Sequence, residues 1–422
     1  MKRIILTLTL LLLCGNLYAQ FDKFFFQKTL RLDFYHCGTA TEQEYFFKEL
    51  IEEPHWAGNE KNLIDTKEHG NQMVKLFDAA SGELIYSQGY CTIFNEWQTT
   101  LEAQKIKKCY PEAVIMPFPK NPARVEIYAR NAKNEFVKEF EYEVNPSSYW
   151  IRKSVPNDIT FDVVYNGAPK HKVDIVLLAE GYTSQEKFEE DAKRFAEELV
   201  RFEPFKSRAK DFNIRGVYRT TGEHGVSLPG ENLWKQTALQ SHYYTFDSER
   251  YLIVDDFQRV RDMAANVPYD VVYILSDSKK YGGGGIYNFY GISAAGDPEL
   301  AGEVYVHEFG HLFAGLGDEY VGTTGYDGFY KTDVEPWEEN LTTLVDFDKK
   351  FWKKMLPAGT KIPTEDVDKN EKVLGVYEGG GYQNKGIYRP WRNCIMRDLR
   401  KSEGFCPVCI RALEEVMNRF TK

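Results

Sequence analysis

One short segment, VHEFGH at residues 306–311, constrains this chain more than any other part of its sequence. Residues four apart on an α-helix lie on one face about one turn apart, so the two imidazoles can reach a single metal ion. Glu308 directly follows the first histidine and can take a proton from a water on that ion. The spacing therefore predicts a helix with a catalytic zinc site, in which His307 and His311 are metal ligands and Glu308 is the general base.

The flanking residues set the expected ends of this helix. Asp297 and Pro298 have the character of a helix start, with Asp as the N-cap and Pro in the first turn. Gly315 and Gly317 supply the stop. The alternative interpretation is a chance match to the motif, with two histidines on an ordinary packed or solvated helix face.

A third protein ligand is expected beyond the helix, because catalytic zinc keeps three protein ligands and one open position. The run GLGD at 315–318 resembles the metzincin pattern, in which a glycine turn is followed three residues later by His or Asp. The spacing departs from that pattern by one residue, since Gly315 lies four residues past His311 instead of three. Asp318 is the predicted third ligand. Glu319 is its rival, and a simple loop or cap role for Asp318 is the remaining alternative.

A methionine turn beneath the metal is the second metzincin feature, and the run NCIMR at 393–397 fits that place. It follows the glycine-rich run GVYEGGGY at 375–382. A lone methionine is usually core filler. Combined with the upstream helix, Met396 is instead predicted to lie under the metal site.

Further short runs accompany the helix and the DEY sequence that follows it. They are AEGYT at 179–183, EPF at 203–205, YEGG at 377–380, YRP at 388–390, CIM at 394–396 and CPVC at 406–409. Together they resemble the bacterial immunoglobulin A peptidase family of zinc metallopeptidases over roughly residues 165–422. The resemblance implies a peptidase with one catalytic Zn²⁺ and a protein or peptide substrate, and an additional N-terminal domain is usual in that family.

The pattern of apolar residues predicts two domains, because about 400 residues exceed one ordinary core. Residues 20–148 alternate at the strand spacing of an all-β sandwich, which we interpret as an accessory domain. Residues 149–165 are predicted to be a linker. In residues 166–422 buried strands alternate with helices, which indicates an α/β fold. The resemblance implies that this is a metzincin-like zinc peptidase domain, with a twisted sheet and an active-site helix.

Four consecutive glycines, residues 282–285, come just before the predicted metal helix. No Gly-Lys-Ser/Thr follows them, so a phosphate-binding loop is excluded. We expect them to form a flexible turn into an edge strand at 286–293, where a substrate could add as a further strand. A plain sheet strand is the alternative. A further donor is expected to stabilise the oxyanion. Tyr377, Tyr382 or Tyr388 could supply it, and the sequence does not rank them; a structural role is the alternative for each.

Residues 1–19 have the composition of a secretory signal, with Lys2 and Arg3 before an apolar run and a small residue before Gln20. Lipoprotein-type cleavage at Cys14 is the alternative. Without this segment 51 basic and 63 acidic residues remain, a net charge of −12. This balance disfavours nucleic acid and anionic membranes as partners. We expect an exported protein, periplasmic or extracellular, without membrane insertion, and the sequence does not indicate its oligomeric state.

The cysteines fall into two groups. Those beyond the signal segment are Cys37, Cys91 and Cys109 in the N-terminal region and Cys394, Cys406 and Cys409 near the C-terminus. In an oxidising compartment disulfides can form, and a disulfide from Cys394 to Cys406 or Cys409 is the preferred interpretation. Free buried thiols, a redox pair and half of a structural zinc site are alternatives. The zinc site is one ligand short in the local sequence, where no histidine completes it.

The predicted function is that of a secreted zinc endopeptidase acting on extracellular proteins, with host immunoglobulins or mucins among the candidates. One alternative is an exported protein- or glycan-binding module on a peptidase scaffold with weak catalysis. Another is zinc-dependent hydrolysis of a bond other than a peptide. The intact Glu308 weighs against the binding module, since degenerate scaffolds often lose the base first.

Overall fold

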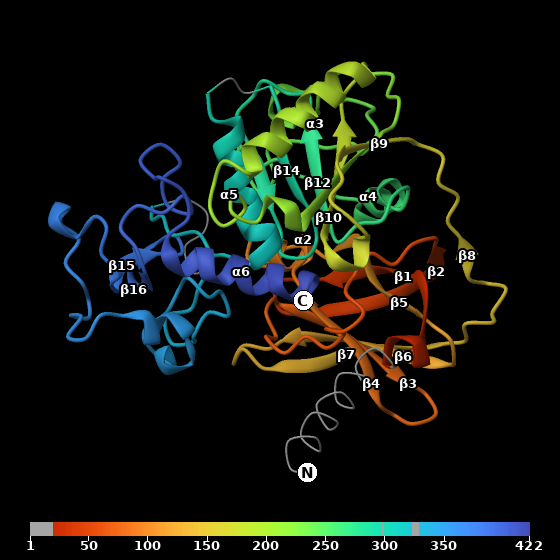
Figure 1. The fold of residues 1–422 in the computed structure, drawn as a ribbon, viewed down its shortest axis with the longest axis horizontal. Coiled ribbons are helices and arrows are strands. Elements are labelled where there is room, and N and C mark those ends of the chain that lie inside the picture. The colour runs from red at the N-terminus through yellow and green to blue at the C-terminus, as the bar shows by residue number, and fades with distance from the viewer. Residues whose placement is uncertain (1–19, 297–298, 323–328) are drawn as a thin grey trace, which may run out of the picture.

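Two sheet systems dominate the computed structural model, which describes residues 20–296, 299–322 and 329–422. In Figure 1 the N-terminal strands, red to orange, lie below a mixed α/β region that runs from yellow to teal. The predicted signal at residues 1–19 and the predicted helix start at Asp297 and Pro298 lie outside the described residues. Within the described part of the chain, no helix has the length and apolarity that a membrane span requires.

The N-terminal part packs two four-stranded sheets face to face, in the orders β5-β1-β2-β8 and β4-β3-β6-β7. The strands are β1 (Phe25–Gly38), β2 (Gln43–Glu53), β3 (Gln72–Asp78), β4 (Leu84–Tyr90), β5 (Lys108–Pro119), β6 (Ala123–Arg130), β7 (Phe136–Val144) and β8 (Arg152–Lys153). Leu32 of β1, Leu76 of β3 and Ile127 of β6 are fully buried between the sheets. This arrangement is the sandwich expected from alternating side chains.

A six-stranded mixed sheet lies at the centre of the second part, in the order β13-β14-β12-β10-β11-β9. Its parallel strands are β10 (Val173–Glu180), β11 (Phe212–Tyr218), β12 (Val271–Ser276) and β14 (Gly291–Ala294). The edge strands β9 (Ile159–Val164) and β13 (Gly283–Gly285) run antiparallel to their neighbours. Every residue of β10, β11 and β12 is buried, as is typical of parallel strands covered on both faces. The predicted α/β class is confirmed.

Helices position the rest of this part around the sheet. They are α3 (Gln185–Leu199), α4 (Phe257–Ala264), α5 (Ala301–Ala314) and α6 (Pro407–Thr421), with short 3₁₀ turns η1 (Pro169–His171), η2 (Ala209–Asp211), η3 (Pro229–Glu231), η4 (Phe347–Lys349), η5 (Phe351–Met355) and η6 (Asp368–Asn370). Phe195 of α3 meets Tyr305 of α5 edge to face, with ring centroids 5.1 Å apart. The hairpin of β15 (Tyr377–Gly380) and β16 (Gln383–Arg389) lies in the C-terminal lobe, drawn in blue in Figure 1.

The two parts share a hydrophobic core. Phe94 and Trp97 of the short helix α2 (Ile93–Trp97) are buried in the same cluster as the central strands of the second part. Residues 149–165, predicted to be a linker, contribute β8 to an N-terminal sheet and β9 to the central sheet. Each end of this segment therefore pairs with a different sheet, and residues 154–158 between β8 and β9 belong to no strand. We propose that the domain boundary lies within this segment.

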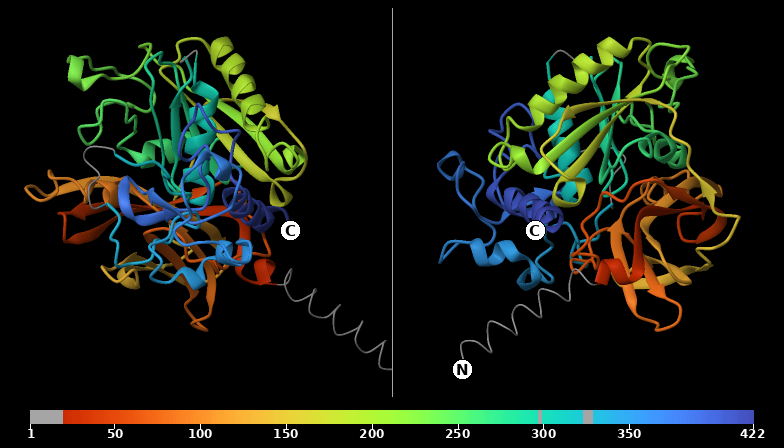
Figure 2. Two further views of the ribbon diagram at one scale, coloured as in Figure 1. Left: turned by 90° about the vertical axis from the view of Figure 1, so that its left-hand side faces the viewer. Right: turned by 45° about the vertical axis from the view of Figure 1, so that its right-hand side comes forward.

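The C-terminal helix α6 joins the two parts a second time. Asn62 Nδ2 donates to the carbonyl of Arg419 at 2.8 Å, and Asn59 Nδ2 donates to that of Phe420 at 2.9 Å. In Figures 1 and 2 the helix lies at the level where the α/β region meets the N-terminal sheets. Phe313 of α5 stacks on Phe420 at a centroid distance of 6.2 Å, so α6 also supports the helix that carries the predicted site.

Candidate active site

Helix α5 carries His307, Glu308 and His311, as predicted. It begins at Ala301 with Leu300 at the N-cap position. It ends where Gly315 takes a left-handed conformation (φ 60°, ψ 38°) and donates its N–H to the carbonyl of His311. A Cβ on Gly315 would also lie 2.4 Å from the ring of Trp337. Both the left-handed backbone conformation and this close contact therefore require glycine at position 315.

The structure brings the predicted ligand atoms together. Nε2 of His307 and Nε2 of His311 are 3.1 Å apart, and Oδ1 of Asp318 lies 3.2 Å from each. Ligands about 2.05 Å from one tetrahedral zinc ion are about 3.3 Å from each other. Two imidazole nitrogens and one carboxylate oxygen are also a donor set that zinc prefers. The residues present therefore fit a single zinc ion.

Backbone carbonyls hold both imidazoles in the orientation that a metal needs. Nδ1 of His307 donates to the carbonyl of Ile395 at 3.0 Å, and Nδ1 of His311 donates to that of Leu316. A carbonyl can only accept, so each Nδ1 carries a proton and each Nε2 is the ring nitrogen turned toward the place of the metal. Ile395 belongs to a tight turn closed by a 2.9 Å bond from the Arg397 N–H to the Cys394 carbonyl.

This is the turn predicted to lie beneath the metal, and it packs against α5. Met396 is fully buried, and its sulfur lies 3.0 Å from the place that a Cβ on Gly310 would occupy. Gly310 is thus the residue that lets the turn approach the helix between the two histidines. The turn fixes His307 through Ile395 and packs Met396 under the same helical turn.

Asp318 is fixed by hydrogen bonds from outside the helix. The hydroxyl of Tyr382 donates to its Oδ2 at 2.6 Å, and the N–H of Gly381 donates to its carbonyl at 2.8 Å. Burial opposes ionisation of Asp318, but the two histidines outweigh burial and hold the pKa of Asp318 well below its usual value. Burial lowers the pKa of His311, and the Asp318 carboxylate raises it more strongly, to about 9.

Glu308 faces the same space from the helix. Burial is the largest influence on it and raises the pKa of its carboxyl group above the usual value. A groove of about 830 Å³ opens over this residue, within the range of ordinary ligand sites. Its walls come from both parts of the chain and include Asn71, Thr92, Asn95, Glu96, Arg250, Tyr251, Tyr281, Gly282, Gly283, Gly284, Gly285, Tyr320 and Tyr382.

The edge strand beside the groove is the glycine run itself. β13 pairs with β14, and β14 pairs with β12 on its other side, so the prediction of an edge strand at 286–293 is wrong. The glycines form a strand instead of a flexible turn because they pair with β14, and they also lie against α5. A Cβ on Gly285 would stand 2.3 Å from the carbonyl oxygen of Glu308, which any larger residue would displace.

The three predicted oxyanion donors lie in different places. Tyr382 lines the groove beside Asp318. The hydroxyl of Tyr377 instead donates to the backbone carbonyls of Asn370 and Val373, outside the groove. Tyr388 lies in β16 and is not among the lining residues. Of the three, Tyr382 therefore remains beside the site.

Glu96 is a groove residue that the sequence did not reveal. It lies in α2 of the N-terminal part, and its carboxylate accepts a hydrogen bond from the hydroxyl of Tyr251. Burial is the main cause that raises the pKa of Glu96 to about 7, and the negative charges of Glu308 and Asp318 add to it. No local sequence signal separates Glu96 from the many other acids of its domain.

Glu319, the rival third ligand, points away from the histidines. Its Oε1 lies 3.5 Å from the sulfur of Cys409. Cys37 and Cys109 form a disulfide. Cys394, Cys406 and Cys409 are buried free thiols, so the predicted staple among them is not formed in the structure.

Two protein-family models match the chain. Residues 162–371 and 365–417 match the model described as IgA Peptidase M64, and residues 20–141 match the one described as Peptidase M64 N-terminus. No curated protein matches the chain. The matched ranges contain α5, Asp318 and Met396 and extend over most of the molecule, which confirms the resemblance seen in the sequence. The chain therefore belongs to the IgA peptidase M64 family.

Proposed function

We propose that this chain is an exported zinc-dependent endopeptidase of extracellular proteins, host immunoglobulins or mucins among them. Its family implies a metallopeptidase that acts on proteins or peptides. The observation that carries the proposal is the convergence of His307, His311 and Asp318, whose ligand atoms lie within 4.8 Å of one another. Glu308 stands beside them in the same groove.

We assign His307, His311 and Asp318 as the ligands of the catalytic zinc. When bound, zinc lowers the pKa of a water to about 7 and polarises the carbonyl of the scissile bond. The arrangement of helix, following aspartate and buried Met396 turn supports a metzincin-like site, and so does the antiparallel edge strand β13.

Glu308 is assigned as the general base. It accepts the proton of the attacking water and passes it to the nitrogen of the leaving amine. Its raised pKa suits this task, because a carboxyl group that is buried binds and releases a proton closer to neutral pH. Tyr382 keeps Asp318 in place through its hydroxyl, and the Ile395 carbonyl keeps His307 in the required tautomer.

The substrate is proposed to lie along β13 in extended form. Gly284 and Gly285 present backbone to the groove without side chains, so a peptide can approach the strand closely. The N-terminal part also lines the groove, through residues such as Asn71, Asn95 and Glu96. We infer that the N-terminal domain takes part in substrate binding.

Export is supported by two independent features. The composition of residues 1–19 is that of a secretory signal. The Cys37–Cys109 disulfide is of a kind that persists in oxidising compartments outside the cytoplasm. A fractionation experiment with the full chain would place the protein in the periplasm or the medium.

The test compares wild-type protein with Glu308→Gln on casein, immunoglobulin and mucin. We expect hydrolysis to fall by about 10²–10⁴-fold, because the substitution removes the general base. Zinc should stay bound, because the substitution leaves all three proposed ligands in place. Glu303→Gln is the matched control, since Glu303 lies on the same helix, pairs with Arg201 at 3.7 Å and does not line the groove. Undiminished hydrolysis by Glu308→Gln would exclude this mechanism. Bound zinc with no hydrolysis of any protein would favour a binding module.

A further inference from the structure

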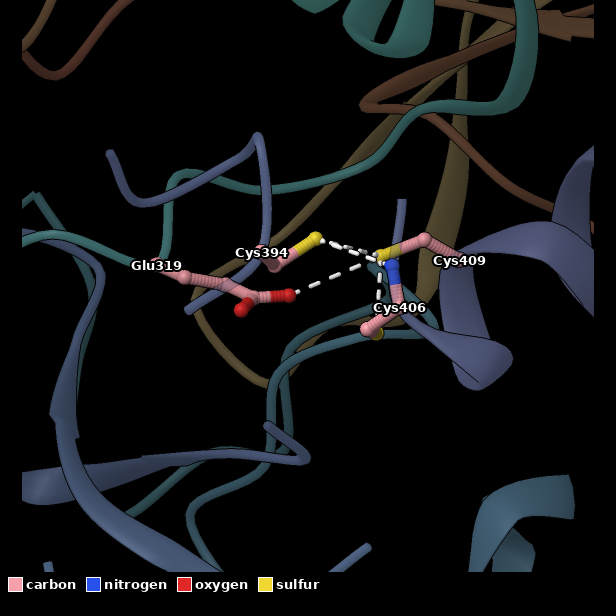
Figure 3. A group of neighbouring side chains, drawn as sticks. All are labelled: Glu319, Cys394, Cys406 and Cys409. Atoms are coloured by element: carbon pink, nitrogen blue, oxygen red, sulfur yellow. Dashed lines mark hydrogen bonds between the residues drawn. The ribbon is translucent and has the colours of Figure 1, made fainter. Parts of the chain in front are cut away.

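A second cluster of metal-ligating side chains lies close to the proposed active site. Glu319, Cys394, Cys406 and Cys409 each offer one ligand atom, and these four atoms lie within 4.8 Å of one another. All four residues are buried, and the most exposed of them, Cys406, is 2% exposed. Figure 3 shows the side chains of Glu319 and Cys394 extending toward Cys409, with Cys406 beside it at the start of the same helix.

We propose that these four residues bind a structural zinc ion in a Cys₃Glu site, separate from the catalytic ion. Structural zinc sites are four-coordinate and closed, and thiolates with one further ligand are a usual donor set. Three thiolates and a carboxylate carry the same formal charge as the common four-cysteine site. The inference does not depend on the proposed peptidase activity.

The distances match a shared ion better than any covalent pairing. The sulfur of Cys409 lies 3.8 Å from that of Cys394 and 3.5 Å from that of Cys406. Sulfurs that each lie about 2.3 Å from one tetrahedral zinc are about 3.8 Å apart, whereas disulfide sulfurs are about 2.05 Å apart. A sulfur and a carboxylate oxygen on that zinc are about 3.5 Å apart, which equals the 3.5 Å between Cys409 Sγ and Glu319 Oε1.

Among the described residues, no Lys, Arg or His forms an ion pair with the carboxylate of Glu319 within 4.0 Å. This carboxylate is fully buried, its Oε1 accepts a 2.9 Å hydrogen bond from Asn340 Nδ2, and its Oε2 has no hydrogen-bond partner in the described part of the chain. Arg389 places its guanidinium on Asp366 and on backbone carbonyls instead. Burying a charge without a compensating partner is costly, and a divalent ion between Glu319 and the sulfurs supplies that compensation.

The cluster connects to the catalytic residues through backbone bonds. The N–H of Glu319 donates to the carbonyl of Met396 at 2.8 Å, which joins the loop of Asp318 to the methionine turn. Cys394 directly precedes Ile395, whose carbonyl orients His307. Cys406 and Cys409 lie at the start of α6. An ion held by all three segments would therefore position two ligands of the first site.

The test measures the metal in the full chain and in His311→Ala, which removes one catalytic ligand and leaves the cysteine cluster unchanged. We expect wild-type protein to hold two zinc ions per chain and His311→Ala to keep one. X-ray absorption on His311→Ala should then show zinc with sulfur neighbours at about 2.3 Å. Adding Cys409→Ser to His311→Ala should remove this ion, whereas adding Cys91→Ser, a buried free cysteine outside the cluster, should not.

Three results would overturn the proposal. They are a zinc-free His311→Ala protein, zinc in it with only nitrogen and oxygen neighbours, and a Cys394 disulfide to Cys406 or Cys409 in non-reducing mass spectrometry. The X-ray absorption measurement decides the question even if the double variant fails to fold, because it needs no change in the cluster. None of these measurements follows hydrolysis. A result that overturns the structural zinc site is therefore distinguishable from one that overturns the proposed peptidase activity.

Discussion

Asp318 and Glu319 are consecutive residues whose carboxylates enter two different clusters of metal-ligating side chains. Oδ1 of Asp318 lies 3.2 Å from Nε2 of His307, while Oε1 of Glu319 lies 3.5 Å from the sulfur of Cys409. Two adjacent residues therefore supply ligands to two different ions, the proposed catalytic ion and the proposed structural ion. Single substitutions of Asp318 and of Glu319 should therefore distinguish the effects of the two ions.

Asp318→Asn should empty the catalytic site and leave the cysteine cluster loaded. The amide is a poorer zinc ligand than the carboxylate, and removing even an indirect partner of a zinc ligand costs about 10–100-fold in affinity. We expect a larger loss than that, with hydrolysis near background at limiting zinc. Zinc titration against a chromophoric chelator measures the affinity. A variant that keeps wild-type affinity and activity would show that Asp318 is not a ligand.

Tyr382→Phe should weaken zinc binding without abolishing it. The substitution removes the 2.6 Å hydrogen bond to Oδ2 of Asp318 and keeps the ring in place. We expect an affinity lower by about 10–100-fold, the usual effect of losing such a supporting bond. Tyr388→Phe is the control, because Tyr388 does not line the groove. Equal affinities in the two variants would contradict the role given to Tyr382.

Removing zinc with a chelator should lower both hydrolysis and thermal stability. An ion that binds only the folded chain adds about 2.7 kcal/mol at a free concentration of a hundred times its Kd. In His311→Ala, chelation should still lower the unfolding temperature, because the cysteine cluster remains. Calorimetry with and without added zinc tests this. An unfolding temperature of His311→Ala that is indifferent to zinc would argue against a second stabilising ion.

Glu96→Gln should remove a pH dependence of stability in zinc-free protein. Burial raises the pKa of Glu96 from 4.5 to about 7, so the folded chain binds this proton more tightly than the unfolded chain. Its stabilising contribution is complete below the unfolded pKa and is lost as the pH rises through about 7. Because Glu96 is only half-buried, we expect wild-type protein to lose about 1–3 kcal/mol that the variant retains.

Urea unfolding of both proteins at about pH 5 and about pH 8 measures this difference. Zinc must be removed first, because its positive charge in the groove would lower the pKa of Glu96. Glu44→Gln serves as the control, since Glu44 is exposed on the surface of β2. The same pH dependence in Glu96→Gln and wild-type protein would contradict the assignment.

Gly285→Ala should displace Glu308, the proposed general base, although it adds only one methyl group. The new methyl group would stand 2.3 Å from the carbonyl oxygen of Glu308, so β13 must move away from α5. Overpacking of this kind costs about 1–3 kcal/mol, and the rate should fall through displacement of Glu308. Gly222→Ala is the matched control, since nothing lies within 4 Å of its added Cβ. Unfolding curves and hydrolysis rates of the two variants should diverge.

The parts of the fold with a strong local period could be predicted from the sequence. The apolar run of β10 and the helical spacing of α5 are decided by burial, which local patterns report well. The local pattern within β2 is weak, because Phe46 and Phe47 stay exposed and its charged residues break the alternation. The strand β13 was missed because glycine has little intrinsic strand preference and forms a strand here through its backbone pairing with β14, which the side-chain pattern does not report.

The candidate site also has one part that the sequence predicts and another part that it does not. His307, Glu308 and His311 lie on one helical turn, so their spacing alone places them together. The choice between Asp318 and Glu319 depends on the path of an irregular loop, which the sequence does not specify. The cysteine cluster seemed one ligand short because Glu319 comes from far upstream in the chain and meets the sulfurs only in the fold.

The side-chain-free strand β13 has a consequence for selectivity, if the groove binds substrate as we propose. A run of glycines can recognise only what every polypeptide has in common, its amides and carbonyls. Discrimination between residues flanking the cleaved bond would then fall to the side chains that line the rest of the groove, such as Asn95 of the N-terminal part and Tyr320 of the second part. Related chains could change their substrate preference by altering these side chains alone, while the hydrolytic chemistry stays constant.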